Sequence, residues 1–211
     1  MSNYKHPLHL LGLGLALALG CGVDRSIFTH SICDEGLKIA GELDVMGELD
    51  YLALRLSYDD EDFTSTLQEL AVFGEPCATA SDREACLDAL SSLPERSMLS
   101  QSTPLDTRYH TVAWTRGDEL GVALTAEEVL ALVGPVDRDA EAAFVATALF
   151  HDIICDGDDN IAVVDDGYIL LTRSRGACGY YAEHVIFAST SGDIETLETK
   201  VLRRDDRGCE S

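Results

Sequence analysis

The chain lacks the short motifs that mark common catalytic sites. It has no G-x-S-x-G nucleophile elbow, no H-E-x-x-H zinc motif, no P-loop and no S-x-x-K pair. It also has no C-x-x-C, the spacing typical of zinc and thiol redox sites. Catalytic residues can meet in space without a motif, so an enzyme is not excluded. The sequence nevertheless favours a protein without catalytic activity.

Positive charge is scarce as well. Lys and Arg number 15 against 38 Asp and Glu, which gives a formal net charge of −23. Such a surface repels phosphate backbones, so we expect no nucleic-acid partner. We interpret most of the excess as a solvated acidic surface. The alternative is a surface that attracts cations or a basic partner.

No apolar run is long enough to span a bilayer as a helix, which takes about 20 residues. Residues 8–19 form an apolar run of twelve residues, interrupted by His9 and two glycines, after a short basic start at Lys5 and His6. Gly20 and Cys21 follow directly. This layout is typical of a cleavable secretory signal, which we assign to residues 1–20.

The segment Ala18-Leu19-Gly20-Cys21 resembles the lipobox of bacterial lipoproteins, although Ala18 stands where leucine is commonest. The resemblance covers residues 1–21 only. It implies that Cys21 becomes the lipid-bearing first residue of the mature chain and anchors it to a membrane through diacylglycerol and palmitate. Gly22 after the cysteine resembles lipoproteins sorted to the outer membrane. The alternative is plain secretion, since the same segment also suits the ordinary secretory peptidase.

The cysteine count agrees with an anchored cysteine in an oxidising compartment. Of seven cysteines, lipidation of Cys21 leaves six, enough for three disulfides. Cys77 and Cys86 are close in sequence, and Cys155 and Cys178 bracket a predicted hairpin, so we pair each of these couples. Cys33 and Cys209 then remain for each other by elimination. Fifteen connectivities are open to six cysteines, and this set is one of them.

The elements predict an α+β fold of short helices packed on a C-terminal antiparallel meander, stapled by disulfides. Alternation predicts a strand over 52–58, and residues 63–73 have the composition of a short helix. Capping boxes predict helices that start at Ser81 and Thr125, and a third helix follows Asp137 or Asp139 and runs to about 150. The predicted meander consists of 161–164, 168–172, 181–189 and a strand ending near 202, with Asp166-Gly167 as its first turn.

The polar, proline-containing stretch 95–106 divides the mature chain. We expect a helical or mixed segment over 21–94, a linker over 95–106 and an α+β domain over 107–211. The body also resembles the poorly characterised domains of other exported, cystine-containing lipoproteins. That resemblance implies no particular activity.

The densest group of oxygen ligands is at 156–160. Asp156, Asp158 and Asn160 alternate as at the start of an EF-hand calcium loop. Ile161 then occupies the place of the glycine, and Gly167 that of the bidentate glutamate. We therefore predict a solvated turn with no metal site, and keep these three residues as the alternative ligand set.

Three histidines are candidates for acid–base chemistry. His110 and His184 lie in predicted strands, and His151 ends a predicted helix. His151-Asp152 spells the metal-binding pair of HD-type phosphohydrolases, but the strands that follow do not suit that helical family. The tripeptide Arg116-Gly117-Asp118 matches an adhesion motif, and we interpret it as a hairpin turn.

These observations favour an envelope-anchored, non-enzymatic module that binds a protein or cell-wall component of unknown identity, with no cofactor and no catalytic residue. The alternative is a small periplasmic or surface hydrolase that uses one of these histidines and a carboxylate. The two differ in whether the fold brings two of the histidines, or a histidine and a carboxylate, together in a pocket.

Overall fold

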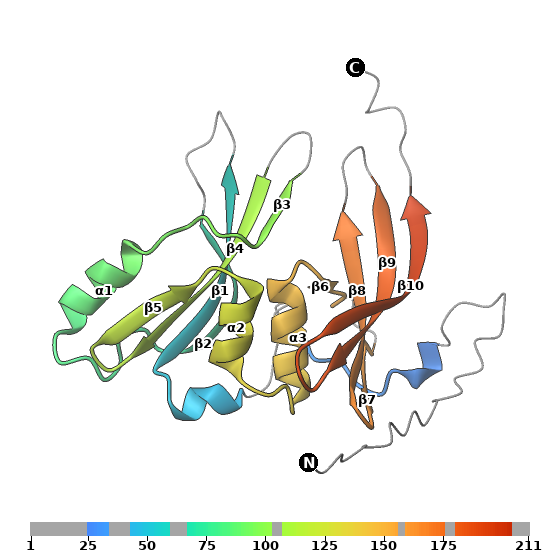
Figure 1. Ribbon diagram of the computed structural model, residues 1–211, viewed down its shortest axis with the longest axis horizontal. Coiled ribbons are helices and arrows are strands. Elements are labelled where there is room, and N and C mark those ends of the chain that lie inside the picture. Colours follow the sequence, from blue (N-terminus) through green and yellow to red (C-terminus); the bar gives the residue numbers. More distant parts are fainter. Residues whose placement is uncertain are drawn as a thin grey trace, which may run out of the picture.

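A computed structural model describes residues 25–33, 43–59, 67–102, 107–155, 159–175 and 180–203. These residues form two antiparallel sheets with helices packed between and beside them (Figure 1). The fold class is α+β, as predicted from the sequence, with most of the regular structure in strands.

The first sheet has the order β2-β1-β4-β3, with β5 also paired to β4. Its strands are β1 (Tyr51–Asp59), β2 (Gln68–Gly74), β3 (Ser100–Ser102), β4 (Thr107–Arg116) and β5 (Glu119–Ala123). The alternating stretch 52–58 does form a strand, and Leu54 of β1 lies opposite Val112 of β4. Both side chains are fully buried, as expected for the apolar positions of an alternating strand. The alternation of apolar residues over 52–58 thus predicted the strand correctly.

The second sheet is the predicted meander. Its order is β10-β9-β8-β6, with β7 also paired to β8. Its strands are β6 (Asp152–Ile153), β7 (Ile161–Val164), β8 (Gly167–Arg175), β9 (Tyr181–Ser189) and β10 (Ile194–Arg203). The turn between β7 and β8 is Asp165-Asp166, one residue before the predicted Asp166-Gly167. Gly167 begins β8 with a positive φ that a side chain would strain.

Helix α3 (Asp139–Ala148) joins the two sheets into one core. Nearly all its side chains are buried, and Phe144 shares a hydrophobic cluster with Leu54 of the first sheet and Ile186 of the second. Helix α2 (Ala126–Val133) packs beside it, and α1 (Arg83–Ser91) lies on the far side of the first sheet (Figure 1). Two single-turn 3-10 helices, η1 (Arg25–Ile27) and η2 (Asp44–Gly47), precede β1. None of the described helices is both long and apolar enough to cross a membrane.

The helix starts agree with the sequence in one case of three. Thr125 and Glu128 form the predicted capping box. The cap of α1 is Asp82, whose side chain accepts from Ala85 N–H, and not the adjacent Ser81. Helix α3 starts after Arg138, so neither Asp137 nor Asp139 is its N-cap residue. The carboxylate of Glu141 accepts the N–H groups of the two residues just before the helix, and Asp139 accepts the N–H of Ala140 within its first turn.

The predicted helix over 63–73 is wrong, because β2 occupies its second half. Ala71 pairs with Leu54, and the ring of Phe73 contacts Phe144 edge-on at 5.9 Å. Pairing with a buried strand outweighs the local propensity of this stretch, as is common at sheet edges.

The first sheet contains residues from both sides of the predicted linker and from the linker itself. Strands β1 and β4 lie on either side of 95–106 and pair along their whole length, and β3 lies within that stretch. The stretch is polar because β3 is a short edge strand with mostly exposed residues. The first sheet therefore takes residues from both of the segments that the linker was expected to separate.

Two disulfides are present among the described residues. Cys77 joins Cys86, as the short spacing predicted. Cys33 joins Cys155, so the predicted pairs Cys155–Cys178 and Cys33–Cys209 are wrong. The reason is a long-range contact: residues 29–32 run beside β7 through a bridge between His30 and Ile161, which carries Cys33 to the start of the second sheet. Cys178 and Cys209 lie outside the described residues.

Candidate functional site

The second sheet carries a small hollow on the face that residues 25–33 cover. Its volume is about 290 Å³. The residues that line it are Arg25, Leu171, Glu183, His184, Val185, Glu198 and Lys200. Two cations and two carboxylates face each other here, and Arg25 already forms an ion pair with Glu183. The hollow is at the lower limit for a small-molecule site, and its charges largely satisfy one another.

A hydrogen-bonded chain of three side chains crosses the same sheet. Ser174 Oγ of β8 lies 2.7 Å from His184 Nε2 of β9. The other ring nitrogen, Nδ1, lies 2.9 Å from Thr199 Oγ1 of β10. Since Thr199 is directly opposite His184 in the register, the sheet itself sets this geometry. A serine hydroxyl beside a histidine is the arrangement of a nucleophile and its base.

The surroundings of His184 in this hydrogen-bonded chain favour its neutral form. Burial lowers the pKa of His184 from its usual value. If Ser174 donates to Nε2, then Nδ1 carries the proton and donates to Thr199. A hydroxyl takes the place that a carboxylate holds in a catalytic triad, and it stabilises an imidazolium less.

The hollow and this hydrogen-bonded chain lie mostly on opposite faces of the sheet. Neighbouring residues of a strand alternate between faces, so Glu183 and Val185 point away from the side of the His184 ring. His184 is nevertheless among the residues that line the hollow.

His151 lies near His184 but forms no reactive pair with it. Burial lowers the pKa of His151, and the charge of His184 lowers it further. Burial also lowers the pKa of His184, so both rings favour the neutral form at pH 7. They lack the opposite charge that would poise one of them as a general acid.

His110 is a core residue. Its ring stacks on Phe150 with centroids 3.9 Å apart, and Nδ1 lies 3.1 Å from the carbonyl oxygen of Ala148. Burial lowers the pKa of His110 to about 4. With 2% of its surface exposed, the ring has no access to a substrate.

A histidine–carboxylate pair exists elsewhere, at a residue that the sequence did not single out. His30 Nε2 lies 2.9 Å from Asp139 Oδ2, and His30 Nδ1 lies 3.0 Å from Thr29 Oγ1. The histidine and the aspartate are each more than a third exposed, and neither lines the hollow. Only the pairing of residues 30 and 161 brings them together, so no local signal could have revealed the contact.

Three carboxylates gather where η2 meets α3, namely those of Asp44, Asp137 and Glu141, with one oxygen of each within 4.8 Å of the others. The buried carboxylate of Glu141 accepts backbone N–H groups of residues 44, 137 and 138 at 2.8–3.1 Å. Asp44 also forms an ion pair with Arg138. The group holds η2 against the start of α3, and Arg138 supplies the positive charge that a metal would otherwise bring.

Of the alternative calcium ligands, the structure describes Asn160 alone. Asp156 and Asp158 lie outside the described residues. Asn160 is fully buried, and its Oδ1 accepts the N–H of Ile32 at 3.0 Å while its Nδ2 donates to Ile154 O at 2.7 Å. Its amide is used to hold the segment before Cys33, which leaves no oxygen directed at solvent for an ion.

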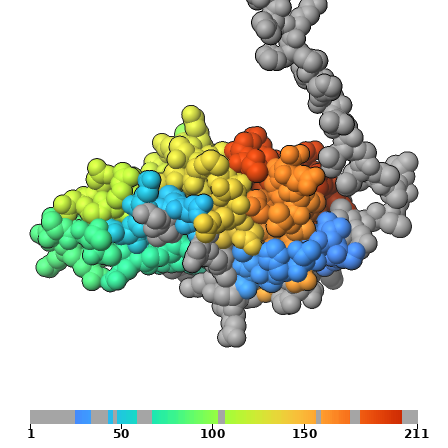
Figure 2. Space-filling model, turned by 90° about the horizontal axis from the view of Figure 1, so that it is seen from below, coloured from blue at the N-terminus to red at the C-terminus, as the bar shows by residue number. Residues whose placement is uncertain are grey.

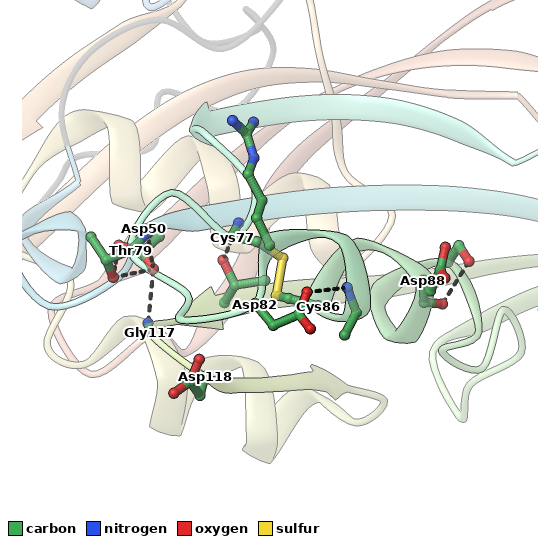
Figure 3. The surroundings of a disulfide bond; sticks show 12 residues. Asp50, Cys77, Thr79, Asp82, Cys86, Asp88, Gly117 and Asp118 are labelled. Carbon is green, nitrogen blue, oxygen red and sulfur yellow. Dashed lines mark hydrogen bonds between the residues drawn. A yellow bond between two sulfur atoms is a disulfide. The ribbon is translucent and has the colours of Figure 1, made fainter.

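The adhesion-like tripeptide is a turn, as interpreted from the sequence. Gly117 donates its N–H to Asp50, whose pKa is lowered by hydrogen bonds from Thr79 and Gly117 (Figure 3). Asp118 accepts from both the backbone and the hydroxyl of Ser81. Arg116 pairs with Glu119 at 2.8 Å. All three residues fix the β4–β5 hairpin next to the Cys77–Cys86 disulfide.

Comparison with known proteins gave no relative. No protein-family model, no curated protein and no solved structure matches the chain.

Proposed function

We propose that the chain is a lipoprotein of the bacterial cell envelope, anchored through Cys21, whose body binds a protein or a cell-wall component without catalysis. The outer membrane is the proposed location. The proposal rests on the signal-like residues 1–21 and on the way in which the body begins directly after them.

The observation that carries the proposal is the attachment of residues 25–33 to the second sheet. Phe28 and Ile32 are buried, Arg25 pairs with Glu183, and the disulfide Cys33–Cys155 closes the segment. Figure 2 shows this segment, in blue, against the second sheet, in orange. Three residues separate Cys21 from Arg25, and the four steps between their Cα atoms span at most about 14 Å. An acylated Cys21 would hold the body close to the membrane, as suits a module that meets its partner at the envelope.

The environments of the histidines favour binding over catalysis. His110 is buried in the core, and both ring nitrogens of His184 contact hydroxyls rather than a carboxylate. We therefore expect His110→Ala, His151→Ala and His184→Ala each to retain binding, apart from effects on folding.

The anchor is tested by detergent-phase partitioning and by mass spectrometry of the N-terminal peptide. The chain should enter the detergent phase with an acylated Cys21, and Cys21→Ser should do neither. Cys209→Ser is the matched control, a cysteine change far from the signal that should leave acylation intact. An unmodified mature start at Cys21, or cleavage at another bond, would contradict the anchor.

Binding is tested by crosslinking the lipidated chain in envelope membranes and identifying what it captures. The expected result is a defined partner that Cys21→Ser, which is not placed at the membrane, captures far less. Equal capture by both forms would show that the anchor has no part in function.

The contact between Ser174 and His184 supports a second candidate, a small esterase-like hydrolase. Ser174 Oγ would attack an ester carbonyl as its proton passes to His184 Nε2, and the leaving alcohol would take that proton. Water would then attack the acyl-serine, giving its proton to His184 and restoring the hydroxyl of Ser174. The lowered pKa of His184 keeps the base neutral at pH 7.

A fluorophosphonate probe and p-nitrophenyl acetate separate the two candidates. A hydrolase would be labelled at Ser174, and Ser174→Ala would lose both labelling and turnover. Ser189→Ala on the same sheet is the control that should keep both. We expect no labelling of the parent chain above that of Ser174→Ala, and specific labelling at Ser174 would favour the hydrolase.

A further inference from the structure

The outer edge of β10 is open. Among the residues that the structure describes, β10 is hydrogen-bonded to β9 alone and ends the order of the second sheet (Figure 1). The strand is ten residues long, against a usual length of about five or six. Such an edge presents a row of backbone N–H and C=O groups to any strand that fits it.

The side chains on this edge strand are unusually apolar for exposed positions. Leu197 is 42% exposed, Val201 52% and Leu202 42%. Register irregularities fall between Thr196 and Glu198 and between Val201 and Arg203, while Glu198–Val201 pairs regularly with β9. We therefore expect additional pairing over this central segment and the adjoining Leu197, because bulges twist the ends of an edge away.

The sequence of β10 is complementary to itself when read in the opposite direction. In an antiparallel pair centred on Thr199, that residue meets its own copy and Glu198 lies opposite Lys200. One step further out, Leu197 lies opposite Val201. The two-fold axis repeats both contacts, so the pair contains two contacts between the opposite charges of Glu198 and Lys200. It also contains two contacts between the apolar side chains of Leu197 and Val201. Both kinds of cross-strand pair stabilise a sheet.

We propose that β10 binds β10 of a second copy of this chain, joining two five-stranded sheets into one continuous sheet with a two-fold axis at Thr199. Lys200 lies opposite Glu183 within its own sheet. In the pair it would lie between that carboxylate and Glu198 of the second copy, which extends an alternating row of charges across the interface.

Strand β2, at the end of the first sheet next to β1, shows that this complementarity is not general. Strand β2 contains one charged residue, Glu69, and no cation. A two-fold pairing of β2 would gain no ion pair, and Glu69 is already bound by the hydroxyl of Tyr51 at 2.6 Å. The edge of β10 is therefore the one we assign to self-association.

The association should be modest and should respond to salt. A single strand pair buries less than the surface of a standard stable interface, and two chains of net charge −23 repel each other. Moderate salt screens this long-range repulsion. We expect a dimer that dissociates on dilution and strengthens between low and physiological ionic strength, measured by sedimentation of the full chain in detergent.

Charge exchange at the central pair tests the register. Glu198→Lys places Lys opposite Lys at two points, and Lys200→Glu places Glu opposite Glu. Each variant should raise the dissociation constant about tenfold, and the double variant Glu198→Lys/Lys200→Glu should restore it to within about threefold of the parent. Both side chains also border the hollow, so each substitution also alters contacts within a single copy. Melting temperatures measured at a concentration where the chain is monomeric detect the effect of those contacts on stability. Failure of the double variant to recover, with an unchanged melting temperature, would overturn the register.

A cysteine at the two-fold axis gives a second, independent test. Opposite residues of an antiparallel pair have Cα atoms about 4.5–5.5 Å apart, within disulfide reach, so Thr199→Cys should form a covalent dimer under mild oxidation. Thr196→Cys is the matched control: its two copies would lie about 20 Å apart and should not crosslink. The parent chain controls for its own cysteines. Equal crosslinking of the two variants, a Thr199→Cys that stays monomeric, or a parent that sediments as a monomer at about 100 μM would each refute the dimer.

Discussion

The side-chain oxygen of Asn160 accepts the backbone N–H of Ile32 at 3.0 Å, across 128 positions of sequence. Asn160 is fully buried, and its amide nitrogen donates to the carbonyl of Ile154. The amide of Asn160 thus attaches residues 25–33 to the loop that leads into β7. The stability of this attachment can be measured.

Asn160→Ala should destabilise the fold by about 3 kcal/mol. It leaves the N–H of Ile32 and the carbonyl of Ile154 buried without their partner, at a cost of roughly 1–3 kcal/mol for each. Asp159→Ala, at the exposed neighbouring position, should change stability by less than about 0.5 kcal/mol. Urea unfolding measures both, and equal effects of the two substitutions would show that the amide has no special role.

Removal of the two disulfides should have unequal effects. The Cys33–Cys155 bond closes a separation of 122 residues, and Cys77–Cys86 closes one of 9. Since loop-closure entropy grows with the logarithm of loop length, Cys33→Ser/Cys155→Ser should cost about 2 kcal/mol more than Cys77→Ser/Cys86→Ser. Denaturant unfolding gives the difference, and non-reducing peptide mapping of the parent checks the pairing itself. Recovery of a peptide that joins Cys155 to Cys178 would contradict the structure.

His110 should make stability depend on pH. Its pKa is about 4 in the folded chain and near 6.5 when unfolded, so the unfolded state binds the proton more readily between these values. The contribution is fully present above pH 6.5 and is lost as the pH falls toward 4, by about 3 kcal/mol in total.

The matched variant for this effect is His110→Gln, which keeps a side-chain N–H for the carbonyl of Ala148 but cannot titrate. The unfolding free energy of the parent minus that of the variant should fall by about 3 kcal/mol from pH 7 to pH 4. Carboxylates and the other histidines titrate in both proteins and cancel in this difference. A constant difference across this range would mean that folding leaves the pKa of His110 unchanged.

Two glycines with positive φ should tolerate alanine differently. A Cβ at Gly167 would lie 2.1 Å from the carbonyl oxygen of Ala188, which is backbone and cannot move aside cheaply. A Cβ at Gly134 would meet nothing within 4 Å, so only the backbone strain of about 1–2 kcal/mol remains. Gly167→Ala should therefore lower the melting temperature well beyond Gly134→Ala. The reverse order would mean that the first turn of the second sheet is built differently.

Local signals in the sequence predicted local structure well. The alternation over 52–58, the Thr125–Glu128 capping box and the turn beside Gly167 each depend on residues within about ten positions, and each is present. The wrong cap of α1 has a simple cause, because Ser81 and Asp82 are adjacent and both residue types cap helices.

The same reasoning could not predict contacts between residues that are far apart in the sequence. The Cys33–Cys155 bond, the strand β2 and the Ser174–His184 contact depend on which strands pair, and no spacing in the sequence encodes that choice. Cysteines were paired with sequence neighbours, which succeeds for a loop of nine residues and fails when the partner is brought by the fold.

The same bond implies an order of folding if the chain is exported from its N-terminus, as proposed. Cys33 then emerges long before its partner, which follows only after 122 further residues, when all of the first sheet has passed. Cys77 and Cys86 appear in between and are separated by only 9 residues, so we expect them to close on each other early. Their closure would remove two competing thiols before Cys155 emerges, and residues 25–33 would be joined to the second sheet last.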